Sequence, residues 1–152
     1  MLPTPTKVTL VSGSGVGETD LTAFDKALIE AGVGNLNLIR VSSILPPGVK
    51  VVDRLDIPPG SLTPAAYGSI GSDQAGTLIT AAIGVGFTKS SFGMIMEYSG
   101  FSSLEKAEGI VRSMVEEAFA ARGLELAEVR VKGVERQVED HTSVFAAAVL
   151  WY

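Results

Sequence analysis

The sequence predicts an α+β fold in which a series of strands is interrupted by two amphipathic helices. Two observations support this class: β-branched and apolar runs bounded by glycine or proline recur along the chain, whereas only two segments repeat apolar residues at spacings of three and four. Strands and helices do not alternate regularly, so a parallel doubly wound sheet is not expected. The 152 residues fit a single domain and are enough to bury a substantial core.

The first part of the chain predicts a strand, a turn, a helix and a second strand. Residues 7–12 (KVTLVS) read as a strand, and the glycine-rich residues 12–18 that follow predict a turn. This turn lacks the lysine of a phosphate-binding P-loop and does not match GxGxxG, so an ordinary strand-to-helix connection is preferred. Thr19 is a plausible N-cap for a helix that stops at Gly32, and residues 37–43 form a second strand. The expected core-facing stripe of this helix is Leu21, Phe24, Leu28 and Ala31.

The middle of the chain predicts a loop followed by three strands. Residues 49–59 contain the prolines and aspartates typical of a loop with at most a short edge strand. Two apolar runs, residues 62–70 and 77–87, flank a polar glycine-containing turn and predict a hairpin. Residues 93–98 (GMIMEY) are expected to form another short strand.

The last part of the chain predicts a long helix and two closing strands. Ser102 with Glu105 three residues later indicates a capping box, and the apolar spacing that follows extends the helix to about Arg122. Residues 125–134 and 143–152 are expected to be strands, although the run FAAAVL in the second could be helical on propensity alone.

Composition excludes several classes of site. The chain has no cysteine and one histidine, His141, so disulfides, thiolate nucleophiles and histidine-rich metal centres are excluded. A net charge of −5 without a lysine or arginine cluster disfavours nucleic acid as a partner. No run reaches the roughly 20 apolar residues of a membrane span, and no export signal is evident, so a cytoplasmic location away from membranes is expected. The 46% hydrophobic content instead suggests buried interfaces between subunits.

Ser42 and Ser43 lie where a predicted strand runs into ILPPG, a turn that can hold strain in the preceding peptide. By pattern alone, two serines at a strand end are usually hydrogen-bonded turn residues. The longer string NLNLIRVSSILPPG (35–48), however, closely resembles the processing segment of the pyruvoyl-dependent arginine decarboxylases, in which paired serines are the self-cleavage site. Four more segments extend the resemblance over essentially the whole chain: GETDLTAFDKALIEAGVGN (17–35), PAAYGSI (64–70), GMIMEYSG (93–100) and FAAAVLWY (145–152).

The resemblance implies a precursor that cuts itself into a β chain, residues 1–42, and an α chain, residues 43–152. The Ser43 hydroxyl would attack the Ser42 carbonyl, and β-elimination followed by hydrolysis would convert Ser43 into a pyruvoyl group. A Schiff base between this self-derived group and arginine would accept the electrons left by CO2, so agmatine would form without pyridoxal phosphate or a metal. Agmatine implies a place in polyamine biosynthesis.

The family also implies a layered αββα sandwich that forms homotrimers, which pair into hexamers. In that family the residue matching Asn37 stabilises the oxyanion of self-cleavage, as an amide donor can. A straight strand would separate Asn37 from Ser43 by roughly 20 Å. Either the strand bends sharply, or Asn37 serves the Ser43 of a neighbouring subunit in an intersubunit active site.

Glu97 can be judged from its strand pattern as well as from the family. Alternation places it on the same face as Ile95, with Met94, Met96 and Tyr98 on the other face, so its carboxyl group is expected to be partly desolvated. Desolvation favours the neutral acid, which can donate a proton after CO2 leaves. A buried hydrogen-bond acceptor or an interface ion pair is the alternative, and similarity to the family's MEY motif favours the proton donor.

Asp25 is expected beside the apolar stripe of the first helix, where most acidic residues merely flank a core. In the family, the matching aspartate of the AFD segment is implicated in binding the substrate guanidinium, which a carboxylate suits. Arg40 could pair with an acid near the cleavage turn, although nothing in the sequence requires it.

Two alternatives stay open. The enzyme could act on another basic amino acid, in which case Asp25 would not read a guanidinium. The chain could also be an uncleaved oligomeric binding or structural protein that retains the fold.

Overall fold

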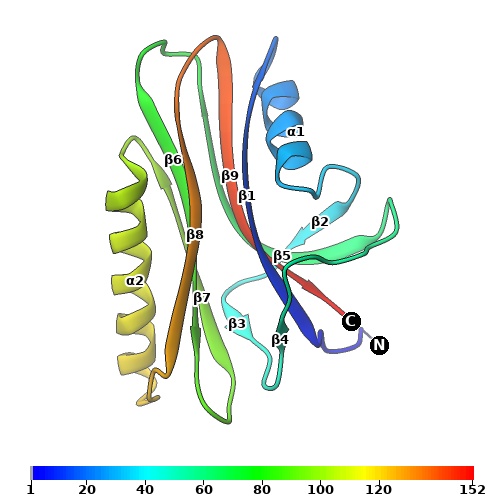
Figure 1. Cartoon of the computed structure of the whole chain (residues 1–152), viewed down its shortest axis with the longest axis vertical. Coiled ribbons are helices and arrows are strands. Elements are labelled where there is room, and N and C mark those ends of the chain that lie inside the picture. The colour runs from blue at the N-terminus through cyan, green and yellow to red at the C-terminus, as the bar shows by residue number, and fades with distance from the viewer. Residues whose placement is uncertain (1) are drawn as a thin grey trace.

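In the computed structural model, which describes residues 2–152, nine strands and two helices follow one another along the chain (Figure 1). The elements are β1 (Lys7–Gly17), α1 (Asp20–Glu30), β2 (Asn37–Arg40), β3 (Ile44–Leu45), β4 (Lys50–Val51), β5 (Leu62–Ser72), β6 (Leu78–Phe87), β7 (Gly93–Gly100), α2 (Leu104–Ala121), β8 (Glu128–Gln137) and β9 (His141–Trp151).

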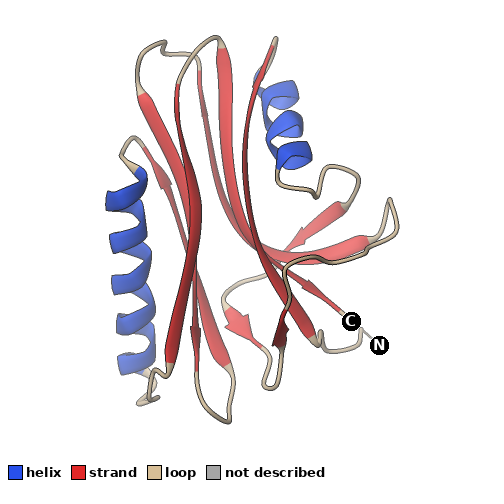
Figure 2. Cartoon of the chain, in the orientation of Figure 1, coloured by secondary structure: helices blue, strands red, loops and turns tan. Residues whose placement is uncertain are grey.

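The strands form two sheets that pack face to face, with one helix on each outer face (Figure 2). The first sheet has the order β2-β5-β9-β1-β4 and is covered by α1, and the second has the order β3-β7-β6-β8 and is covered by α2. The predicted α+β class and single domain are therefore confirmed. The four layers are compatible with the αββα sandwich that the family resemblance implied.

The main core lies between the two sheets. Its buried side chains come from alternate positions of both layers, including Val8 and Val144 from the first sheet and Ile83 and Ile95 from the second. Smaller apolar clusters lie between each sheet and its helix. Burial on both faces explains why β6 and β9 read as nearly continuous apolar runs in the sequence.

The glycine-rich segment after residue 12 is strand and not the predicted turn. β1 continues to Gly17 and pairs with β9 along its whole length. A Cβ atom on Gly15 would lie 2.5 Å from the Ala23 carbonyl oxygen and 2.6 Å from the Ala27 amide nitrogen, both in the backbone of α1. The glycines therefore let the helix rest directly on the strand, and the predicted strand-to-helix turn over these residues is wrong.

The helix α1 starts as predicted, and three of the four residues of its predicted stripe face the core. Thr19 is the N-cap, and its hydroxyl accepts from the Thr22 N–H (3.1 Å). Phe24, Leu28 and Ala31 pack in the cluster between α1 and the first sheet, whereas Leu21 is 75% exposed and does not belong to the stripe. The fully buried side chains of the helix are the small ones of Ala23 and Ala27. Small side chains face the sheet because the close approach to the β1 glycines leaves no space for larger ones.

The predicted hairpin of residues 62–70 and 77–87 is wrong. β5 pairs with β2 and β9 in the first sheet, whereas β6 pairs with β7 and β8 in the second, so the turn between them crosses from one layer to the other. Both runs are apolar on both faces, which is equally consistent with a hairpin and with two central strands in stacked sheets.

The remaining elements follow the predictions with shifts at their ends. The N-cap of α2 is Ser103 and not Ser102, because the Ser103 hydroxyl accepts from the Lys106 N–H (3.2 Å). Glu135 of β8 also accepts from the Leu104 N–H (2.7 Å), which a local pattern cannot foresee. The FAAAVL run is strand, at the centre of the first sheet. Neither helix in residues 2–152 is long and apolar enough to cross a bilayer.

Candidate functional site

The Ser42–Ser43 peptide lies in the link that carries the chain from the first sheet to the second. The predicted strand of residues 37–43 ends at Arg40, after which the Val41 N–H still donates to the Ala65 carbonyl of β5 (3.1 Å). The Ser43 carbonyl then accepts from the Ile95 N–H of β7 (2.7 Å). Ser42 therefore lies between two backbone hydrogen bonds, one to each sheet. Ser42 is exposed and Ser43 is half-buried.

Glu97 lies next to this link. β3 pairs with β7 through Ile44 opposite Met94, so the antiparallel register directs the preceding residues along β7 toward Glu97. Ile95 belongs to the core between the sheets, and Glu97 shares its face. A Cβ atom built on Gly68 of β5 would be 3.4 Å from the Glu97 Cβ, which puts Glu97 against the opposite sheet. The predicted alternation of β7 is confirmed, since Met94, Met96 and Tyr98 pack with α2 residues on the other face.

The electrostatic state of Glu97 follows from this position. Burial of the half-buried carboxyl group raises the pKa of Glu97, and the positive charge of Arg40 opposes part of that rise by lowering it. A carboxyl group with a raised pKa holds its proton at higher pH than an exposed glutamate does. Glu97 is therefore suited to donate a proton beside the Ser42–Ser43 link.

Arg40 lies two residues before Ser42 and contacts Tyr67 of β5. The Arg40 guanidinium lies over the Tyr67 ring, with Cζ 4.3 Å from the ring centroid, and it donates a hydrogen bond to the Tyr67 carbonyl. Tyr67 in turn packs on Phe145 of β9, with ring centroids 5.3 Å apart. Sequence reasoning singled out Arg40 without a partner and gave Tyr67 no role. The available signal was PAAYGSI, where a small Gly68 follows the aromatic residue and leaves space for Glu97.

Asn37 and Asp25 are not brought to this cluster within one chain. Asn37 is at the opposite end of β2 from Arg40, and its side-chain amide donates to the Gly60 carbonyl (2.9 Å). Asp25 is exposed on α1, which covers the outer face of the first sheet, whereas Glu97 faces the space between the sheets. Within one chain, Ser42, Ser43 and Glu97 therefore lie close together, whereas Asn37 and Asp25 lie apart from them.

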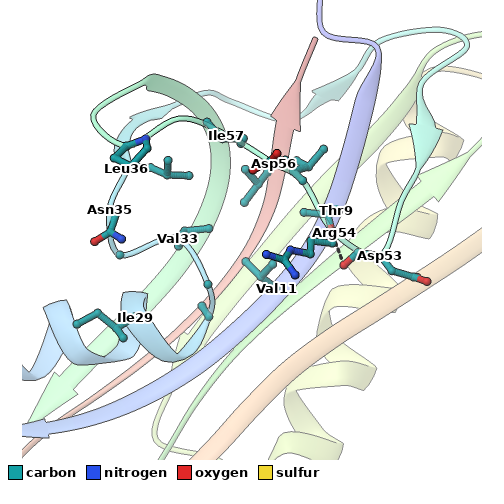
Figure 3. A pocket seen from close by; sticks show the side chains of 16 residues that line it. Thr9, Val11, Ile29, Val33, Asn35, Leu36, Asp53, Arg54, Asp56 and Ile57 are labelled. Carbon is teal, nitrogen blue, oxygen red and sulfur yellow. Dashed lines mark hydrogen bonds between the residues drawn. The ribbon is translucent and has the colours of Figure 1, made fainter.

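A cavity of about 450 Å³ lies on the α1 side of the first sheet, between the end of α1 and the loop of residues 53–59 (Figure 3). Its lining includes Val11, Val33, Arg54 and Asp56, and it contains none of the predicted site residues. The one histidine, His141, has its Nδ1 2.8 Å from an Asp20 carboxylate oxygen, at the start of α1. Within residues 2–152, no cluster of three or more histidine and acidic side chains could hold a metal ion.

Comparison with known proteins assigns the chain to a family. A family model described as pyruvoyl-dependent arginine decarboxylase matches residues 7–152. The chain belongs to this family. It is 50% identical over 150 residues to the pyruvoyl-dependent arginine decarboxylase of Methanocaldococcus jannaschii, covering 97% of this chain and 91% of the relative. The enzyme of the same name from Pyrococcus abyssi is 41% identical over 152 residues, covering 98% and 96%. That from Thermococcus sibiricus is 43% identical over 150 residues, covering 97% and 95%.

Membership of the pyruvoyl-dependent arginine decarboxylases confirms the family expected from the double serine and MEY segments. The family name specifies a pyruvoyl group, and the chain's own residues fit its formation. Ser43 supplies a hydroxyl beside a peptide whose two flanks are hydrogen-bonded to different sheets, and Glu97 supplies an acid with a raised pKa beside it.

Proposed function

We propose that the chain cuts itself between Ser42 and Ser43 and then decarboxylates arginine to agmatine and CO2. The observation that carries this proposal is the placement of the Ser42–Ser43 link across the two sheets, with the desolvated Glu97 beside it on β7. Family membership supports the reaction class, and the local geometry supports the residues.

Self-cleavage requires only groups of the chain and one water. The Ser43 oxygen bonds to the Ser42 carbonyl carbon while the peptide C–N bond breaks and the nitrogen takes the hydroxyl proton. Loss of the Ser43 Cα proton then breaks the Cβ–O bond, so the oxygen leaves with Ser42 as a carboxylate. One water hydrolyses the remaining enamine, its nitrogen leaves as ammonia, and a ketone is left at residue 43.

The position of the cut supports a folded product. The fragment of residues 1–42 contains β1, α1 and β2, and each strand keeps its partner in the first sheet: β1 pairs with β9, and β2 pairs with β5. The fragment of residues 43–152 begins at the edge of the second sheet. The cut therefore breaks a link between layers and no sheet ladder.

Glu97 is assigned the proton transfer that ends the reaction. When formed, the ketone at residue 43 supplies the electron acceptor for the carbanion left by loss of CO2. Glu97 is two residues along β7 from Ile95, whose N–H donates to the Ser43 carbonyl, and burial raises the pKa of Glu97, which favours its protonated form. It then returns that proton to the substrate carbon.

Asp25 is assigned to the substrate guanidinium and Asn37 to the oxyanion of self-cleavage, both acting across a subunit interface. Exposed apolar residues support such an interface, because Leu21 is 75% exposed one turn before Asp25, and Ile39 and Ile44 are exposed on either side of the Ser42–Ser43 link. Association of these surfaces in a trimer, paired into a hexamer, would bring Asp25 of one chain toward Ser43 of the next.

Intact-mass analysis of the purified protein tests the cleavage. The expected result is two chains divided between Ser42 and Ser43, with Ser43→Ala remaining one chain without activity. Ser91→Ala, on the exposed turn before β7, is the matched control and should cleave normally. A fully folded protein that releases CO2 while its backbone stays whole would contradict the proposal and favour an uncleaved fold.

The substrate is tested by CO2 release from arginine, lysine and ornithine at equal concentration. Asp25 as a guanidinium anchor predicts a preference for arginine that Asp25→Asn weakens selectively. Equal turnover of the three in the unchanged protein would favour the broader alternative, a decarboxylase of basic amino acids.

A further inference from the structure

Arg40 occupies the last position of β2, immediately before the link that contains the cut. Its backbone is opposite Ala65 of β5, and its guanidinium is held over the Tyr67 ring and on the Tyr67 carbonyl of the same strand. Three kinds of contact therefore tie this residue to β5: strand pairing, ring stacking and a side-chain hydrogen bond. A residue fixed in this way limits the conformations open to Ser42, two positions later.

The charge of Arg40 also acts at the site. Among the described groups packed around Glu97, β5 offers Gly68 and β6 offers Ile83, so Arg40 of β2 is the charged side chain that acts on this carboxyl. The guanidinium itself faces the Tyr67 ring, 4.3 Å from the ring centroid. Arg40 thus carries a positive charge close to the peptide bond whose cleavage would create a carboxylate on Ser42.

We propose that Arg40 is a positioning residue for this reaction: it fixes the residues before the Ser42–Ser43 peptide on β5 and holds the carboxylate that cleavage frees on Ser42. This inference rests on the proposed self-cleavage. The carboxylate that cleavage would leave is the main-chain terminus of Ser42, only two residues after Arg40. The guanidinium has five N–H donors, and the Tyr67 carbonyl takes one, which leaves donors for a carboxylate.

The first test follows cleavage of the full-length chain made by cell-free synthesis, where the uncut precursor can be observed from the start. Arg40→Met removes the charge and the planar donor group, and it is expected to slow cleavage about tenfold, the effect of losing one charge-assisted hydrogen bond. Arg40→Lys keeps the charge but not the planar fork and is expected to fall between Arg40→Met and the unchanged protein. Arg112→Met, on an exposed position of α2, is the control and should cleave at the normal rate.

The second test separates positioning from general structural support through the pH profile of CO2 release by the cleaved enzyme. Arg40 lowers the pKa of Glu97, so Arg40→Met is expected to move the alkaline loss of activity to higher pH, whereas Arg40→Lys keeps it in place. A purely structural role would lower the rate without moving this limb. If Arg40→Met does not fold, Arg40→Gln carries both tests, because it also removes the charge that lowers the pKa of Glu97.

The outcomes distinguish this inference from the proposed function. An unchanged protein that never cleaves overturns both. Normal cleavage of the unchanged protein, together with normal cleavage rates in Arg40→Met and Arg40→Lys, overturns the role of Arg40 alone. An unmoved alkaline limb in a folded Arg40→Met protein does the same.

Discussion

Replacing Gly15 by alanine tests the packing that positions α1. The new Cβ would lie 2.5 Å from the Ala23 carbonyl oxygen and 2.6 Å from the Ala27 amide nitrogen, and both atoms belong to helix backbone that cannot rotate away. Carbon needs about 3.5 Å from such atoms, so the helix must move outward by roughly 1 Å. That movement loosens the contacts of Ala23 and Ala27, which are fully buried.

The cost of this shift is that of overpacking a well-packed core, about 3 kcal/mol. For a chain of this size it corresponds to a fall in Tm of about 6–12 °C. The matched control is Gly71→Ala, because a Cβ there would be 3.5 Å from the Thr142 carbonyl oxygen, an ordinary contact on an exposed strand position.

Thermal unfolding should be measured in the Ser43→Ala background, so that each sample is one uncut chain, and at one protein concentration, because assembly adds to apparent stability. Gly15→Ala is expected to melt well below the control. Equal melting temperatures would refute direct strand-to-helix contact as the reason for the glycines in β1. A second readout is KM for arginine in the cleavable chain, which should rise if the moved helix displaces Asp25.

Three further predictions concern the site and the second helix. Glu97→Gln is expected to cleave but to release CO2 at least 100-fold more slowly, as measured by single-turnover assay, whereas Glu116→Gln on the exposed face of α2 should be unaffected. The protonated form of Glu97 is the active one and burial raises its pKa, so turnover of the unchanged enzyme should fall as pH rises through that pKa. This loss of activity at high pH should be absent from the residual activity of Glu97→Gln. Ser103→Ala should lower the free energy of unfolding by about 1 kcal/mol in urea, since it removes the N-cap of α2, while Ser102→Ala should change it little.

Local rules predicted those parts of the molecule whose causes lie within a few residues. Thr19 caps α1 and Gly32 follows its end with a φ of +83°, as their positions in the sequence indicated. The alternation of β7 correctly put Glu97 on the face of Ile95 and correctly predicted a desolvated carboxyl. Each of these depends on the period of one element or on one hydrogen bond at its end.

Longer-range features were predicted wrongly or not at all, because their causes are partners far away in the sequence. The β1 glycines are typical of a turn in sequence, but in the fold they are needed because α1 packs directly on them. The β5 and β6 runs are typical of a hairpin in sequence, but β5 pairs with β9 instead. The N-cap of α2 is Ser103, one residue after the predicted Ser102, and Glu135 of β8 supplies a second acceptor for the N–H groups at that end of the helix. Arg40 had no partner in the sequence, since Tyr67 reaches it only through the pairing of β2 with β5, and Glu97 only when the two sheets stack.

The sequence by itself determined the family, the α+β class and the identity of the chemical groups, because motifs and periodicity are properties of neighbouring residues. Only the tertiary structure decided that the Ser42–Ser43 peptide bridges two sheets, that Glu97 faces the space between them, and that Asp25 and Asn37 lie apart from both. The physical reason is that strand pairing and layer packing join residues tens of positions apart, and a pattern apolar on both faces does not specify its partner.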